Sequence, residues 1–209
     1  MADASLADPA LDGASFDYVQ PFAKALRKAR AGKADAQLDV GVAYMTGEGI
    51  ELDRSEAVRW FEKAAAQGNM GGAYNLGLCY RFGLGVDKDP AAAIRWFLQA
   101  GVNRTPLAFM YAKGEGTAQD QAAAVQLFAR AGDHWDDIGA YEAGLFLAIG
   151  RGVAQDFASA WYYLSIAVNG RRLPSATVAR DLVAPLLTKA QLLDVQSKFN
   201  AWRSQMPGR

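Results

Sequence analysis

The segment that decides the fold is Tyr74-Asn75-Leu76-Gly77-Leu78-Cys79-Tyr80-Arg81-Phe82-Gly83-Leu84-Gly85-Val86, because the chain repeats it. Thirty-six residues earlier, the same pattern reads Leu38-Asp39-Val40-Gly41-Val42-Ala43-Tyr44-Met45-Thr46-Gly47-Glu48-Gly49-Ile50. A third copy centres on Tyr111 and Gly114-Glu115-Gly116, and a fourth on Gly144 and Gly150-Arg151-Gly152-Val153. A recurring period of this length is the signature of a repeat architecture. The sequence therefore predicts about four structural units of one kind.

Each glycine pair is followed by an acidic residue and then by apolar residues at helical spacing. The acidic residues are Asp53, Asp89, Asp120 and Asp156, and the apolar runs include Val58-Arg59-Trp60-Phe61 and Ile94-Arg95-Trp96-Phe97. Glycine suits the end of a helix, and aspartate suits the beginning of the next one. Each unit is thus predicted to be a helix, a glycine loop and a second helix, and stacked units bury the apolar faces that a single pair leaves exposed.

A small residue stands in the middle of each predicted first helix, at Gly41, Gly77, Ala108 and Gly144. Glycine inside a helix costs about 1 kcal/mol relative to alanine. Close approach of the paired helix is the expected compensation, so these positions predict tight packing within each unit.

The pattern resembles the Sel-one-like repeat family, a relative of the tetratricopeptide repeats, over about residues 34–169. The first unit matches it nearly throughout, ending with Glu62-Lys63-Ala64-Ala65-Ala66-Gln67-Gly68. The resemblance implies an all-α fold, a right-handed α/α superhelical solenoid of about four helix-pair repeats with helical caps at both ends. The departures are a spacing of 31 residues from Gly77 to Ala108, Thr117 in place of valine and Leu127 in place of an aromatic residue. The shortened spacing predicts a short helix beginning near Pro106 and a kink at the middle of the solenoid.

Four segments are expected from this reading of the chain. Residues 1–15 are predicted to be a disordered acidic arm, and residues 16–33 an N-terminal capping helix. The four repeats are expected over residues 34–170, and C-terminal capping helices interrupted at Pro185 over residues 171–209.

Composition argues against several classes of function. Lysine plus arginine equals aspartate plus glutamate, at 22 each, so a dense basic surface for nucleic acid is not expected. Cys79 and His134 are the single cysteine and the single histidine. The common zinc-ligand spacings are therefore absent, and no Ser-His-Asp or Cys-His catalytic set can be assembled with confidence. We therefore expect no enzyme, no catalytic residue, no metal site and no cofactor.

The chain also lacks a secretory apolar run in its first twenty residues and an apolar stretch long enough to cross a bilayer. A cytoplasmic location is expected on this basis. The oligomeric state is left open.

The resemblance implies that a partner peptide or protein binds in a concave groove lined by the first helix of each repeat. Alignment on the mid-helix small residues predicts the lining residues as Tyr74, Leu78, Arg81, Phe82, Phe109, Lys113, Tyr141 and Leu145. This set combines aromatic, aliphatic and basic side chains, and tyrosine and arginine are frequent anchors at interfaces.

Three functions remain open at this stage. The leading one is a protein–protein interaction scaffold or adaptor. The alternative is a specific inhibitor or immunity-type protein that blocks one enzyme, and an enzyme with a site in the groove is the less favoured third.

Overall fold

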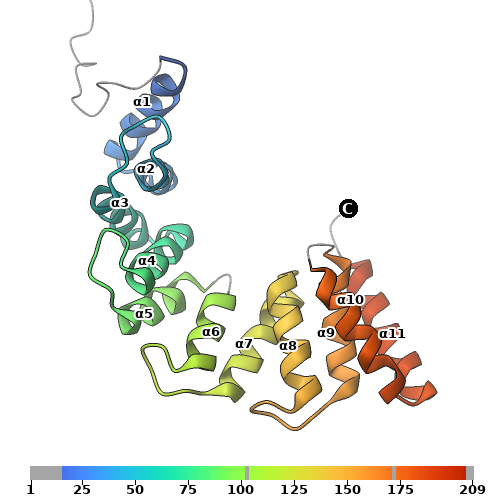
Figure 1. Cartoon of the computed structure of the whole chain (residues 1–209). Coiled ribbons are helices and arrows are strands. Elements are labelled where there is room, and N and C mark those ends of the chain that lie inside the picture. Colours follow the sequence, from blue (N-terminus) through green and yellow to red (C-terminus); the bar gives the residue numbers. More distant parts are fainter. Residues whose placement is uncertain (1–15, 102–103, 171–172, 206–209) are drawn as a thin grey trace, which may run out of the picture. The chain divides into compact units, whose positions relative to one another are not determined.

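The computed structural model describes residues 16–101, 104–170 and 173–205, and its regular elements within these ranges are all helical (Figure 1). The predicted acidic arm, residues 1–15, lies outside the described residues. The helices, in order, are α1 (Phe16–Arg30), α2 (Ala34–Thr46), α3 (Arg54–Ala66), α4 (Met70–Phe82), α5 (Pro90–Ala100), α6 (Thr105–Lys113), α7 (Gln121–Asp133), α8 (Asp137–Ile149), α9 (Phe157–Asn169), α10 (Pro174–Val183), the 3-10 helix η3 (Ala184–Leu186) and α11 (Lys189–Ser204).

The chain divides into two compact units, Met1–Val102 and Asn103–Arg209. The division falls in the segment where the repeat spacing shortens. Unit 1 contains α1 and the pairs α2/α3 and α4/α5, whereas unit 2 contains the pairs α6/α7 and α8/α9 followed by α10, η3 and α11. We call the first helix of each pair helix A and the second helix B.

Within each pair, a ring or branched side chain of helix B occupies the space that the small residue of helix A leaves open. A Cβ atom added at Gly41 would lie 2.6 Å from the Phe61 ring, and one added at Gly77 would lie 2.6 Å from the Phe97 ring. In the fourth repeat, a Cβ at Gly144 would lie 2.6 Å from Leu164. The predicted close approach is therefore present in these three repeats, and in the third repeat Ala108 and Phe128 share a buried cluster.

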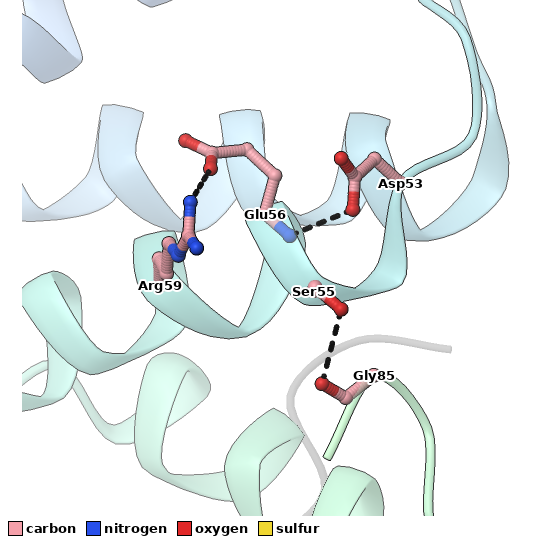
Figure 2. Close-up of polar contacts among 5 residues, drawn as sticks. All are labelled: Asp53, Ser55, Glu56, Arg59 and Gly85. Atoms are coloured by element: carbon pink, nitrogen blue, oxygen red, sulfur yellow. Dashed lines mark hydrogen bonds and ion pairs between the residues drawn. The ribbon is translucent and has the colours of Figure 1, made fainter.

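The four loops from helix A to helix B share one construction. The residue after each helix A is a glycine in the left-handed region, at Gly47, Gly83, Gly114 and Gly150. Each helix B begins with the predicted aspartate as its N-cap, and the aspartate side chain accepts a backbone N–H bond of 2.9 to 3.0 Å at Asp53, Asp89, Asp120 and Asp156. The cap of α3 is shown in Figure 2.

The second glycine of a loop has a further role that the sequence did not indicate. A Cβ at Gly85 would overlap the backbone carbonyl of Arg54 and lie 2.8 Å from the nitrogen of Ser55, at the start of helix B in the preceding repeat. The Ser55 hydroxyl donates to the Gly85 carbonyl at 3.3 Å (Figure 2). In unit 2, a Cβ added at Gly152 would lie 2.7 Å from the backbone carbon of Gln121 and 3.0 Å from the nitrogen of Ala122. These glycines therefore join successive repeats as well as turning the chain.

Both ends of the repeat array are covered by helices, as the fold prediction stated. In α1, Phe22 and Leu26 pack in a buried cluster with Val40 and Trp60. At the other end, Val183 and Val195 pack with Leu164, and Trp202 of α11 donates its indole N–H to the carbonyl of Asp133 at 3.3 Å. Among the described helices, none is both long and apolar enough to span a membrane.

Candidate functional site

The predicted partner-binding residues lie on three A helices, which belong to different units and are described separately. Unit 1 contributes α4 with Tyr74, Leu78, Arg81 and Phe82; unit 2 contributes α6 with Phe109 and Lys113, and α8 with Tyr141 and Leu145.

Three of the predicted aromatic residues are half-buried and pack inside the protein. The Tyr74 ring lies 5.7 Å from the ring of Phe97 on α5, and the Phe109 ring meets Phe128 on α7 edge-on at 4.9 Å, centroid to centroid. Tyr141 packs against the buried clusters that connect α8 with α9 and the C-terminal helices. These rings mainly hold helix A to the rest of its unit, and only their remaining exposed edges face solvent.

Two large apolar side chains at the C-terminal end of helix A are far more exposed. Phe82 ends α4 and is 57% exposed, and Ile149 ends α8 and is 66% exposed. Both stand five residues after the mid-helix glycine, where α6 has the exposed Lys113. Ile149 was absent from the predicted set, although the same count from Gly144 would have found it.

A basic group lies over an aromatic ring near the end of each of these three helices. The Arg81 guanidinium is 5.1 Å from the Phe82 ring centroid, the Lys113 ammonium is 6.0 Å from that of Phe109, and the Arg151 guanidinium is 4.8 Å from that of Phe146. Cations are also favoured at a helix C-terminus by the helix dipole. Within each unit, apolar side chains of the A helices therefore lie next to positive charges. Sequence reasoning missed Arg151, which lies just beyond the helix.

In unit 2, one acidic side chain offsets part of this positive charge. Glu142 of α8 is half-buried. Burial raises the pKa of its carboxyl above the ordinary value, while the charges of Arg151 and Lys113 act in the opposite direction.

The single cysteine and the single histidine, which were considered above for catalysis, lie in the core and at a helix end respectively. Cys79 is buried, and burial raises the pKa of its thiol to about 11, so the thiol is protonated at neutral pH. His134 is exposed and forms the C-cap of α7. Within the described ranges, no group of three or more His, Cys, Asp or Glu side chains is arranged to hold a metal ion.

Comparison with known proteins gives one family. The family described as Sel1 repeat matches residues 34–69, 72–101, 107–134 and 138–170, which is more than half of the chain. No curated protein matches the chain.

Two solved structures share the fold. One is c5321 of uropathogenic Escherichia coli, described as a protective antigen with an SLR fold: it is 26% identical with a TM-score of 0.79, and the match covers 88% of this chain and 41% of that one. The other is a Sel1 repeat protein from Oxalobacter formigenes, 28% identical with a TM-score of 0.67, with coverage of 73% and 65%. The present chain thus spans less than half of the first protein's length.

Proposed function

Because the chain belongs to the Sel1 repeat family, whose helical solenoids generally mediate protein–protein interaction, we propose that it is a scaffold or adaptor that binds a partner protein or peptide with the faces of its A helices. The family is one of non-enzymatic repeat scaffolds. The binding surface and its residues are the specific part of the proposal.

One observation carries the choice of surface. Phe82 and Ile149 occupy the same position of two repeats and are both more than half exposed. Apolar side chains that stay largely exposed at one repeat position contribute little to stacking, whereas exposed apolar surface marks interaction sites and arginine is a frequent anchor there. Arg81 next to Phe82, and Arg151 near Ile149, supply that cation.

The proposed partner surface is apolar with acidic groups. Leu78 and Leu145 are half-buried one turn before Phe82 and Ile149 and widen the apolar surface of α4 and α8. Tyr74, Phe109 and Tyr141 present ring edges beside it, and Arg81 and Lys113 provide positive charge at the helix ends.

The test uses variants whose altered side chains are exposed, so that folding is preserved. Phe82→Ser combined with Ile149→Ser should weaken binding of a captured partner by at least about tenfold, since two interface anchors are lost. Leu98→Ser is the matched control, because Leu98 is 58% exposed but lies on a B helix. Circular dichroism should show equal helicity for all three proteins, and calorimetric titration measures the affinity.

Equal affinity of the double variant and the Leu98→Ser control would refute the surface assignment. A second variant reverses the charges at Arg81 and Lys113. If this variant also binds the same partner with unchanged affinity, the A-helix face is not involved. A single partner bound very tightly at one-to-one stoichiometry would favour the inhibitor alternative over an adaptor.

A further inference from the structure

The turn between α7 and α8 contains a tryptophan where the other turns between repeats contain glycine. In the turns before α2 and α4, Gly32 and Gly68 adopt φ values of +83° and +81°. Trp135 takes the same place with φ of +67°, and it is the one non-glycine residue with positive φ among those that the structure describes.

The hydrogen bonds show that the three turns are equivalent. The Gly68 N–H donates to the Ala65 carbonyl at 2.9 Å, and the next N–H, of Asn69, donates to Ala64 at 3.1 Å. At the α7–α8 turn, the Trp135 N–H donates to Gly132 at 2.9 Å, and the Asp136 N–H donates to Ala131 at 3.1 Å. The turn therefore imposes the left-handed conformation whichever residue is present, although this conformation is unfavourable for a residue with a side chain.

Burial of the indole does not explain why tryptophan stands here. Trp135 is 47% exposed, whereas Trp60, Trp161 and Trp202 are buried in the core clusters. Ile138, three residues further in the first turn of α8, is also half exposed. Residues held in sparsely populated backbone conformations cluster at functional sites, and tryptophan is among the residues most enriched at interface hot spots.

The acidic residues next to Trp135 in the chain indicate the charge of the partner. Carboxylates stand on both sides of it in the chain, at Asp133 and Asp136. Asp136 accepts from the Thr105 hydroxyl and the Gly139 amide, both at 2.9 Å. Burial raises the pKa of the Asp133 carboxyl, while a hydrogen bond from the Tyr163 hydroxyl and the neighbouring His134 act in the opposite direction. Thr105, Gly139 and Tyr163 are neutral donors, so their bonds do not cancel the negative charge of the two carboxylates that flank Trp135 in the chain. A partner cation that stacks on the ring would be attracted by that charge.

We infer that Trp135 and Ile138 form a docking surface for a basic segment of a partner protein, in which a lysine or arginine lies over the Trp135 ring beside Asp133 and an adjacent apolar side chain contacts Ile138. This basic-segment surface lies on the edge of unit 2, on the turn from helix B to helix A. It goes beyond the proposed A-helix face and does not depend on it.

The test is a selection from a displayed library of random 12-residue peptides, with the full chain as the immobilised target. Enriched peptides are synthesised, and their affinities for the wild type and for Trp135→Gly and Asp133→Asn are measured by fluorescence anisotropy. We expect enriched peptides with lysine or arginine next to an aliphatic or aromatic residue. Their binding should weaken at least about thirtyfold in Trp135→Gly, as for an interface hot spot, and several-fold in Asp133→Asn.

Trp135→Gly is also the control on folding, because glycine is the residue that the equivalent turns use. Its thermal midpoint should equal or slightly exceed that of the wild type, because glycine adopts the left-handed conformation without strain. Trp135→Asn, which also tolerates this conformation, should lose the peptides in the same way.

Three results would overturn the inference: peptides without basic residues, equal binding by Trp135→Gly, or a large fall in thermal midpoint in both variants, which would make Trp135 a structural residue. The Phe82→Ser and Ile149→Ser double variant should bind these peptides like the wild type. Failure of the A-helix face and failure of the basic-segment surface are therefore separate outcomes.

Discussion

At the scale of single residues, the two glycines of each loop perform different tasks although both have positive φ. Gly83 ends α4, and a Cβ added there would meet Lys88 at an ordinary contact distance of 3.4 Å. A Cβ added at Gly85 would overlap the backbone of Arg54 and Ser55 in the preceding repeat, and Figure 2 shows Gly85 beside Ser55. Substitution at the two sites therefore separates the conformational cost from the packing cost.

We predict that Gly85→Ala lowers the free energy of unfolding clearly more than Gly83→Ala does. Both variants incur roughly 1–2 kcal/mol from the left-handed backbone. Gly85→Ala adds about 1–3 kcal/mol because a rigid backbone must shift to accept the methyl group. Urea unfolding followed by circular dichroism measures both free energies. Equal decreases in the two variants would show that the backbone between the repeats shifts with little loss of stability.

At the scale of elements, the four B helices are positioned by the same aspartate cap. In α3, the Asp53 carboxylate accepts the Glu56 N–H at 2.9 Å, and on the same turn Glu56 pairs with Arg59 at 3.0 Å (Figure 2). The two interactions differ in kind. The cap satisfies a backbone donor that otherwise has no intrahelical partner, whereas the ion pair holds two flexible side chains near solvent.

Asp53→Ala should reduce the free energy of unfolding by about 1 kcal/mol, and Asp53→Asn by much less, because asparagine caps as well as aspartate does. Arg59→Ala is the matched comparison and should cost less than about 0.5 kcal/mol, as is usual for an exposed pair. Denaturant titration of the three variants tests the order. A loss in Arg59→Ala that equals the loss in Asp53→Ala would contradict it.

At the scale of the whole molecule, each of the two compact units has its own buried clusters. Phe61 is fully buried in a cluster of unit 1, and Phe128 is fully buried in a cluster of unit 2. Solenoid stability is approximately a sum of terms for repeats and for nearest neighbours, so damage to one repeat acts mainly on those next to it.

Phe61→Ala, which should cost about 3–5 kcal/mol locally, is therefore predicted to speed amide hydrogen exchange in α2 to α4 more than in α7 to α9. Phe128→Ala should give the reverse pattern. Exchange measured by mass spectrometry under native conditions distinguishes the two. A uniform increase along the chain in both variants would mean that the molecule opens only as one cooperative unit.

The sequence by itself determined the helix pairs, the glycine and aspartate positions at their ends and the family, because these depend on local backbone preferences and on a pattern that recurs four times. The structure brought Gly77 against Phe97 as the mid-helix glycine predicted. It also placed Pro106 in the first turn of the short helix α6, as the shortened spacing had predicted.

Only the tertiary structure decided which side chains remain available to a partner. Tyr74 and Phe109 belong to the predicted groove, but their rings pack on α5 and α7, whereas Ile149, which was not predicted, is exposed. The contact of Gly85 with the preceding repeat depends on segments that folding brings together. The left-handed backbone of Trp135 depends on a turn that the adjacent helices impose. Periodicity assigns a residue to a face of its helix, but the depth and neighbours of that face are set by the helices that pack against it.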